Sequence, residues 1–440
     1  MEQRKYGLPT AITMIVGIVI GSGIFFKSDN ILIFTGGNLL SGVIALCVAA
    51  ISIVFGCLAL SELASRTDKA GGVITYAEVF CGERTACGFG WFHTFMYYPT
   101  LTVVVSWVAG VYINMLFGIP NTLENQILIG SVCLALVFAW NVISAKLGGY
   151  FQNASTLIKL LPLALFAIAG FALGNPTASF AQDIQSVQTA SWIAAIAPVV
   201  FAFDGWMVAT SVCHEIKNSK RNLPLAMIIA PILILIVYVL YFVGISSLVG
   251  TDQVLALGDA HVDSAAQMLL GTAGAKVVLV FVIISVLGTV NGLVMGSIRL
   301  PYSLALRDML PAAQNYVSVN SKTGIPMRSA LLSFLACVIW MVIHYVTQKF
   351  NLMPNSDVSE ISIVVNYLGA ILLYIAVMRL AKKGEIQNKV RGYLLPALAV
   401  LGSIIILIAG MQNPLFWYNV LLSLLVVAAS QLFYTTRKTK

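Results

Sequence analysis

The chain has 440 residues, of which 59% are hydrophobic and 10% charged, whereas roughly 25% of the residues of ordinary soluble domains are charged. A membrane-spanning helix needs about 20 mostly apolar residues, so this composition supplies about twelve such helices. Water cannot solvate so apolar a surface, and the composition therefore excludes soluble, disordered and nucleic-acid-binding proteins. We therefore attribute the net charge of +8 first to basic residues that gather in cytoplasmic loops of a membrane protein.

The apolar segments predict an all-α polytopic membrane protein with about 12 transmembrane helices. The connections between them are too short to bury a separate core, so residues 1–440 are expected to form a single integral membrane domain. The predicted spans are 8–35, 39–63, 87–117, 126–145, 153–173, 190–214, 223–249, 273–304, 328–347, 360–380, 393–411 and 414–434.

The basic residues predict the orientation of these spans, because Lys and Arg gather in cytoplasmic loops. With the N-terminus inside, 21 of the 25 Lys and Arg residues fall in inside segments. Only Lys27, Lys276 and Lys349 fall outside, and Lys159 lies within a span. The asymmetry predicts a multi-pass protein of the cell inner (plasma) membrane with both termini in the cytoplasm.

The first predicted span contains glycines and a serine near mid-membrane depth, at Gly17 and at Gly21-Ser22-Gly23. Such residues also serve close helix packing, but Gly-Ser-Gly favours an unwound turn. An unwound turn frees N–H groups at the start of the next half-helix, which suit a carboxylate. The carbonyl groups that end the preceding half-helix suit an ammonium group. Together they fit an amino acid, which carries both groups on one carbon.

The sixth predicted span contains Pro198 and then the segment from Phe201 to Trp206, which includes Asp204 and Gly205. A centrally placed Asp costs about 2.5–3.5 kcal/mol on insertion scales, so Asp204 should face a cavity or a partner. Interrupted helices at matching positions of two halves point to the central site of a transporter. The first and sixth predicted spans are five spans apart, so their interruptions fall at matching positions of two halves.

Several motifs together resemble the amino acid–polyamine–organocation superfamily, and in particular its L-type amino acid transporter branch. The resemblance covers essentially the whole chain and is greatest to bacterial alanine–serine–cysteine exchangers of that branch. The motifs that carry it are Gly21-Ser22-Gly23-Ile24-Phe25, Leu60-Ser61-Glu62-Leu63, Gly71-Gly72, Tyr76-Ala77-Glu78 with Phe80, Asp204-Gly205-Trp206, Glu215-Ile216-Lys217-Asn218, Arg221-Asn222-Leu223-Pro224, Arg299-Leu300 and Gly324-Ile325-Pro326.

The resemblance implies a 5+5 inverted-repeat, LeuT-like fold in which helices 1 and 6 are broken. The repeats would be about 8–173 and 190–380, followed by two extra helices at about 393–434. An amino acid would bind between the segment 19–23 and the segment 201–204.

The resemblance also implies roles for the residues of these two segments. Gly21, Ser22 and Gly23 would offer N–H groups to the substrate carboxylate, and the carbonyls of Val19 and Phe201 would accept from its ammonium group. Ile20 and Ala202 complete the two segments, and Phe201, Phe203 and Asp204 would line or gate the side-chain end. Many relatives have a small residue where this chain has Asp204, which leaves the substrate preference open.

Lys159 lies about eight residues into the fifth predicted span, roughly 12 Å deep at 1.5 Å per residue. Its side chain either snorkels to the interface or acts as a fixed internal cation facing the first span. In the family that this chain resembles, a lysine here stands where sodium-coupled relatives bind sodium, which implies sodium-independent transport. Tyr241 and Asn291 are weaker candidates for a coupling network and could instead be locally satisfied polar residues.

The resemblance implies a sodium-independent exchanger of small neutral L-amino acids such as alanine, serine and cysteine, working by alternating access. The alternative is a cationic or broad neutral amino acid transporter that works as a proton symporter or uniporter. An enzyme is not expected, because no paired acid and base or metal cluster stands out. A channel is disfavoured because few polar residues lie in the spans.

No cofactor or metal is expected, since His93, His214, His261 and His344 lack metal-ligand spacing. Amino acid substrates and the lipid bilayer are the expected partners. Animal members of the resembled family often join an accessory glycoprotein through a cysteine in the loop after span 3. The corresponding loop 118–125 has no cysteine, so no disulfide-linked accessory subunit is expected.

Overall fold

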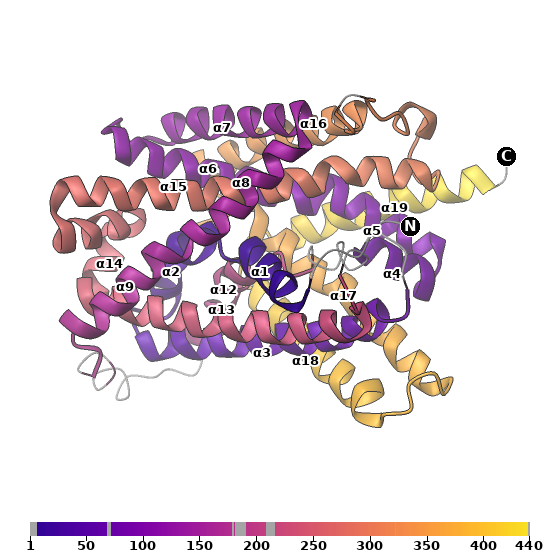
Figure 1. Ribbon diagram of the computed structural model, residues 1–440, viewed down its shortest axis with the longest axis horizontal. Coiled ribbons are helices and arrows are strands. Elements are labelled where there is room, and N and C mark those ends of the chain that lie inside the picture. Colours follow the sequence, from indigo (N-terminus) through magenta and orange to yellow (C-terminus); the bar gives the residue numbers. More distant parts are fainter. Residues whose placement is uncertain are drawn as a thin grey trace.

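The fold is a bundle of helices (Figure 1) in the computed structural model, which describes residues 7–67, 72–177, 180, 191–207, 216–321 and 323–438. The α-helices are, in chain order, α1 (Leu8–Val19), α2 (Ser22–Phe34), α3 (Leu39–Ala64), α4 (Gly72–Cys81), α5 (Glu83–Phe92), α6 (Tyr98–Phe117), α7 (Leu123–Ile143), α8 (Ala145–Ile158), α9 (Leu160–Leu173), α11 (Ser191–Ala194), α12 (Ile196–Phe203), α13 (Ser219–Val249), α14 (Thr251–Leu257), α15 (His261–Leu306), α16 (Met327–Lys349), α17 (Val358–Lys382), α18 (Leu395–Gly410) and α19 (Phe416–Lys438). The π-helical turns η1 (His93–Tyr97) and η5 (Val390–Leu394) precede α6 and α18, and short 3₁₀ turns are η3 (Gly258–Ala260) and η4 (Ala313–Asn315).

The number of membrane spans agrees closely with the prediction. Among the described residues, ten helices are long and apolar enough to cross a membrane, and the bent pair α1–α2 makes eleven. The predicted span 190–214 is described only as far as Met207, where α12 has already ended at Phe203. The second half of that predicted span, 208–214, lies outside the described residues.

The predicted interruption of the first span is confirmed. α1 ends at Val19, α2 begins at Ser22, and the two helices meet at a bend of 52°. Glycine is required here by close packing: a Cβ atom on Gly21 would lie 2.0 Å from Thr289 Oγ1, and one on Gly23 would lie 2.5 Å from Ala202 Cα.

In the sixth predicted span α12 ends at Phe203, and the described chain continues in turn conformation to Met207. Pro198 lies in the first turn of α12, where its missing N–H removes no intrahelical bond. Asp204 is the C-cap of the helix, and Gly205 follows with a φ of +99°, a conformation that residues other than glycine rarely adopt. The chain therefore leaves the helix at the Asp-Gly pair that the sequence singled out.

The two interrupted helices lie at the centre of the bundle. α12 packs against α2, α3 and α17, while α1 packs against α8, α13 and α15. α6 lies across α15 and α7, and α18 covers α3. The breaks in both helices are therefore enclosed by protein instead of lipid, which is the condition under which non-helical backbone is tolerated at membrane depth.

The two ends of the bundle carry different charges. One end, which we call the basic end, has arginines that follow or end α3, α15 and α19: Arg66 pairs with Glu62 at 2.7 Å, Arg307 with Glu78 at 3.0 Å, and Arg437 with Asp308 at 2.7 Å. The opposite end carries the ion pair of Lys349 with Glu124. Lys27, which the topology count placed in an outside segment, is instead inside α2 and only 1% exposed.

Candidate functional site

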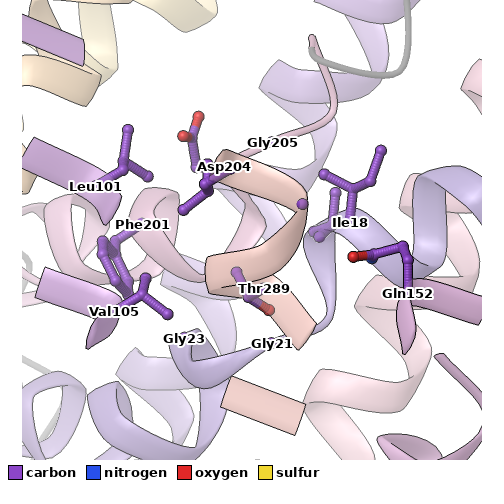
Figure 2. A pocket seen from close by; sticks show the side chains of 13 residues that line it. Ile18, Gly21, Gly23, Leu101, Val105, Gln152, Phe201, Asp204, Gly205 and Thr289 are labelled. Carbon is purple, nitrogen blue, oxygen red and sulfur yellow. The ribbon is translucent and has the colours of Figure 1, made fainter. Parts of the chain in front are cut away.

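A small cavity of about 30 Å³ lies between the end of α1 and the end of α12 (Figure 2). Its lining comes from α1, α2, α6, α8, α12 and α15, so segments from most of the chain meet there. Most of the surface is apolar, and the polar side chains that line it are Gln152, Asp204 and Thr289. The predicted residues Val19, Gly21, Gly23, Phe201 and Asp204 all line this cavity.

The breaks supply backbone groups to the cavity. Val19 is the last residue of α1, and α2 starts three residues later, so the N–H groups of its first turn have no partner within the helix. These N–H groups carry the partial positive charge of a helix N-terminus. The arrangement can therefore bind a carboxylate on one side and an ammonium group on the other.

Tyr238 of α13 connects the two breaks. Its hydroxyl group donates toward the carbonyl of Ala202, 2.8 Å away, and toward the carbonyl of Val19, 3.3 Å away. A hydroxyl has a single proton to donate, so the two carbonyls share one donor. Lone pairs therefore remain free on these two oxygens.

Asp204 is held by a tyrosine of the third span. Tyr97 donates from its hydroxyl to Asp204 Oδ2 at 2.6 Å, and the Asp204 side chain is 6% exposed. Tyr97 ends the π-helical turn η1, and such turns inside helices are frequent at functional sites. The carboxylate thus both lines the cavity and ties α12 to the third span.

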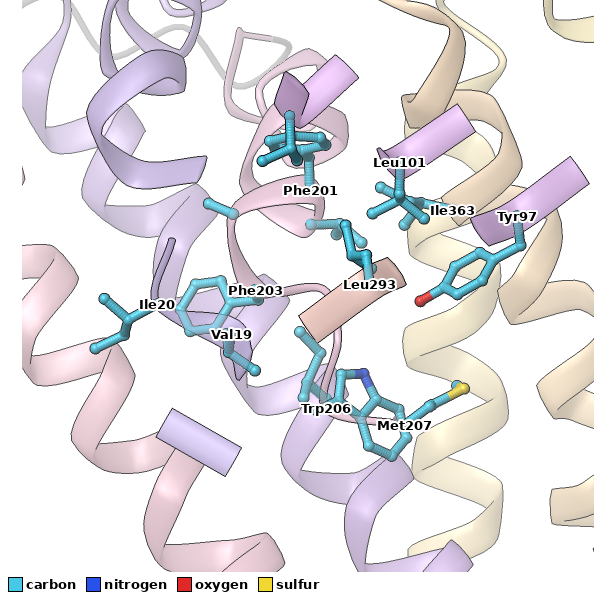
Figure 3. Packing of buried hydrophobic residues seen from close by; sticks show 14 of the residues in the cluster. Val19, Ile20, Tyr97, Leu101, Phe201, Phe203, Trp206, Met207, Leu293 and Ile363 are labelled. Atoms are coloured by element: carbon cyan, nitrogen blue, oxygen red, sulfur yellow. The ribbon is translucent and has the colours of Figure 1, made fainter. Parts of the chain in front are cut away.

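The remaining predicted residues of the two segments are placed differently (Figure 3). The aromatic ring of Phe203 packs edge-on against Tyr238 at 5.0 Å, and Phe203 does not line the cavity. The N–H of Ile20 completes the last turn of α1 by donating to Val16 at 2.8 Å. Ala202 contacts Gly23 through its backbone, and Ser22 begins α2. The proposed lining role of Phe203 is therefore not supported by its position.

Lys159 faces the first span and does not snorkel. Its side chain is fully buried, and Nζ donates to the carbonyl of Gly17 at 2.6 Å and to Thr289 Oγ1 at 3.3 Å. Thr289 also contacts Gly21 closely and lines the cavity. The ammonium group of Lys159 therefore lies beside the end of α1, linked to the cavity through one hydroxyl.

Asn291 and Tyr241 differ in their surroundings. Asn291 Oδ1 accepts from Trp140 at 2.9 Å and from Asn141 at 2.8 Å, while Nδ2 donates to Gly148 at 3.0 Å and to Gln152 at 3.1 Å. Asn291 thus joins α7, α8 and α15. The hydroxyl of Tyr241 is buried and has no hydrogen-bond partner among the described residues.

Sequence reasoning missed three side chains of this site: Tyr97, Gln152 and Tyr238. Tyr238 lies three residues before Tyr241, so the two share one face of a helix. A tyrosine pair at this spacing in a span was the available signal. Tyr97 and Gln152 carried no comparable signal, because their roles depend on helices that are distant in sequence.

The chain matches the amino acid permease family over residues 6–430. It therefore belongs to this family of the amino acid–polyamine–organocation superfamily, and it is L-type-like. It is an amino acid transporter and not an enzyme, as the sequence predicted.

Relatives in bacteria and mammals support this assignment. The chain is 28% identical to the serine/threonine exchanger SteT of Bacillus subtilis (strain 168), over 92% of this chain and 90% of SteT. It is 26% identical to the human b(0,+)-type amino acid transporter 1, over 98% of this chain and 87% of the relative. It is 28% identical to the mouse large neutral amino acids transporter small subunit 2, over 78% of this chain and 67% of the relative.

The contacts of Asn291 and Tyr241 predict opposite effects of substitution on stability. Asn291→Leu leaves several buried donors and acceptors unpaired, each at a cost of about 1–3 kcal/mol, so the melting temperature of purified protein in detergent should fall clearly. Tyr241→Phe removes only the unpartnered hydroxyl and should leave the melting temperature nearly unchanged. Equal melting temperatures for the two variants would contradict the structural role of Asn291.

Proposed function

We propose that the protein is a sodium-independent exchanger of small neutral L-amino acids, such as alanine, serine and cysteine, that works by alternating access. The observation that carries this proposal is the mostly apolar cavity between two interrupted helices, with backbone groups of both helices beside it. The similarity to a protein named a serine/threonine exchanger supports small substrates and exchange.

In this proposal the substrate carboxylate binds the N–H groups at Gly21, Ser22 and Gly23. The substrate ammonium group binds the carbonyls of Val19 and Phe201. The free lone pair of Ala202 adds a third acceptor, because its carbonyl shares the Tyr238 proton with that of Val19. A small side chain then points toward Phe201 and Asp204. A bound amino acid would join the two half-helices, and this bridging would lower the barrier to their movement.

We propose that Lys159 replaces a coupling ion. Its ammonium group lies between two oxygen atoms, the carbonyl of Gly17 and the hydroxyl of Thr289. These are ligands of the kind that a hard cation takes from proteins. A permanent positive charge at this position would do the electrostatic work of a sodium ion and exclude it. Asn291 contributes to the network indirectly, through Gln152, which lines the cavity.

We further propose the 5+5 inverted-repeat arrangement, with repeats at about 8–173 and 190–380 and extra helices at about 393–434. The arginines of the basic end favour an orientation in which this end and both termini face the cytoplasm. The chain would act without a disulfide-linked subunit. Its opposite end, with Glu124 and Lys349, then faces outward, and we call it the outer end.

The alternative, a carrier of cationic or a broad range of neutral amino acids that works as a proton symporter or uniporter, draws on one observation. Asp204 lines the cavity, and a carboxylate there could attract a positively charged side chain. The hydrogen bond from Tyr97 favours the other role, in which Asp204 holds the end of α12 against the third span.

Transport by purified protein in liposomes tests the proposed exchange. Labelled alanine should enter liposomes preloaded with alanine but not liposomes loaded with buffer alone, and replacing sodium by choline should not change the rate. Equal entry into empty liposomes would indicate uniport or ion-coupled symport. A requirement for sodium would overturn the proposed role of Lys159.

Lys159→Met removes the ammonium group and keeps the length of the side chain. Hydrogen bonds to charged groups are worth about 1.5–3 kcal/mol, so alanine exchange should fall about ten- to hundredfold in rate or apparent affinity. Lys276→Met is the matched control, because Lys276 is an exposed lysine of α15, and its exchange should equal that of the wild type. Unchanged exchange by Lys159→Met would remove Lys159 from the mechanism.

Competition experiments separate the two roles of Asp204. Excess lysine should compete poorly with labelled alanine in the wild type, and Asp204→Asn should keep this preference because an amide oxygen can still accept from Tyr97. If Asp204 recognises cationic substrates, lysine should compete well and Asp204→Asn should weaken that competition about ten- to hundredfold.

A further inference from the structure

A buried charge cluster lies at the outer end, above the cavity. Lys27 of α2 donates to Asp357 Oδ2 at 2.7 Å and to Glu360 Oε1 at 2.6 Å, and the three side chains are 1%, 1% and 3% exposed. Asp357 caps α17 and Glu360 lies in its first turn. The cluster therefore fastens the second half of the broken first span to the tenth predicted span.

The cluster is directly connected to the cavity through Phe201. The ring of Phe201 lines the cavity, and its centroid lies 5.0 Å from Lys27 Nζ. Phe201 thus separates the cavity from the charges, and Lys27 lies over the face of the ring. Any movement of α2 that opened this side of the cavity to water would also have to separate Lys27 from α17.

The charges of the cluster do not balance. One ammonium group faces two carboxylates, which leaves one surplus negative charge in a buried position. Hydrogen bonds lower its cost: Asp357 Oδ1 accepts from the N–H of Ser359 at 2.9 Å and from the Ser359 hydroxyl, and Glu360 Oε2 accepts from Ser356 at 2.6 Å. An uncompensated buried charge remains expensive even so, and a bound proton would remove it.

The surrounding titratable groups increase the imbalance. Among the described residues, the titratable groups that interact electrostatically with the cluster or with each other around it are Asp29 of α2, Tyr112 of α6, Tyr241 of α13, Asp259 of η3, His261 of α15 and His344 of α16. Two of these are further carboxylates.

His344 of α16 lies beside the cluster. Its ring is fully buried, interacts electrostatically with Asp357 and Lys27, and packs against Trp107 at 4.6 Å. Neither ring nitrogen has a hydrogen-bond partner among the described residues. The test of the cluster therefore has to separate the contribution of His344 from that of Glu360.

We propose that Glu360 holds a proton when the outer seal, formed by Lys27, Asp357 and Glu360, is closed. The proton is released when α2 moves away from α17 and water solvates the separated charges. This inference rests on the proposed transport function and orientation. It predicts that outer pH sets how readily the site opens outward.

The sign of the effect follows from proton numbers. The closed seal binds one proton more than the open seal, so a rise in outer pH favours opening. For a single linked proton the change in the equilibrium is at most tenfold per pH unit. A seal that keeps the same protonation in both states would show no dependence on outer pH.

A labelling experiment measures opening without requiring transport. A cysteine is introduced at Asn30, which is buried in α2, and a second variant carries one at Gln253, which is exposed in α14 at the same end. Protein in liposomes is treated from outside with a membrane-impermeant thiol reagent at pH 5.5 to 8.5. The Asn30→Cys rate divided by the Gln253→Cys rate cancels the titration of the thiol itself.

The labelling ratio should rise with pH in the wild-type seal, by up to tenfold per unit over part of the range. Glu360→Gln leaves Lys27 paired with Asp357 alone and removes the proposed proton site, so it should abolish the dependence. Asp357→Asn has the same effect on charge and retains a good helix cap, so it replaces Glu360→Gln if that variant does not fold. Glu124→Gln is the matched control, because Glu124 pairs with Lys349 on the surface of the same end, and it should keep the full dependence.

A flat ratio in the wild type, or an unchanged slope in both Glu360→Gln and Asp357→Asn, would overturn the proton site. His344→Gln should keep the pH dependence, and loss of the dependence in this variant would place the proton on His344 instead of Glu360. A pH-dependent ratio in protein that fails to exchange alanine would support the proton site while contradicting the proposed function.

Discussion

Backbone polar groups that lack a partner inside a bilayer cost several kcal/mol each, and the centre of this protein is organised around two places where they occur. α1 stops at Val19 and α12 stops at Phe203, which frees N–H and carbonyl groups at membrane depth. Neighbouring helices enclose both ends, and Tyr238 supplies one proton to two of the freed carbonyls. The N–H and carbonyl groups that remain without a partner can bind a carboxylate and an ammonium group, and an amino acid carries both.

The buried charged side chains around this centre also bind groups at or near the ends of these helices. Lys159 donates to the carbonyl of Gly17, close to the end of α1, and Asp204 accepts from Tyr97 at the end of α12. Each buried charge therefore holds one end of a broken helix against an unbroken one. Lys27 does the same for α2, but with two carboxylates in place of one partner. The surplus negative charge distinguishes the cluster of Lys27, Asp357 and Glu360 from the other buried charges.

The small residues of the centre have a steric role. Gly21 and Gly23 allow contacts with Thr289 and Ala202 that no larger residue would permit without displacement. Gly288 of α15, the residue before Thr289, likewise allows Ser155 and Lys159 to approach. Gly21 and Gly23 thus bring the junction of α1 and α2 into close contact with α15 and α12.

The sequence by itself determined the membrane class, the family, nearly all the spans, the break in the first span and the Asp-Gly pair at which α12 ends. It could do so because apolar length, Gly-Ser-Gly, and Asp beside Gly are local features whose physical effects do not depend on distant residues. It also indicated Lys159 as an unusual charge, but it could not choose between snorkelling and burial. That choice depends on Gly17 and Thr289, which lie 142 and 130 residues away.

Only the tertiary structure decided which polar groups meet. Tyr97 and Asp204 are 107 residues apart, and Lys27 and Glu360 are 333 residues apart. The tertiary structure also decided where the ring of Phe203 lies. Phe203 neighbours cavity-lining residues in sequence, but its ring packs against Tyr238. Hydrogen bonds and ion pairs form over about 3 Å, so their partners are fixed by how helices pack, and helix packing brings together residues that no local pattern relates.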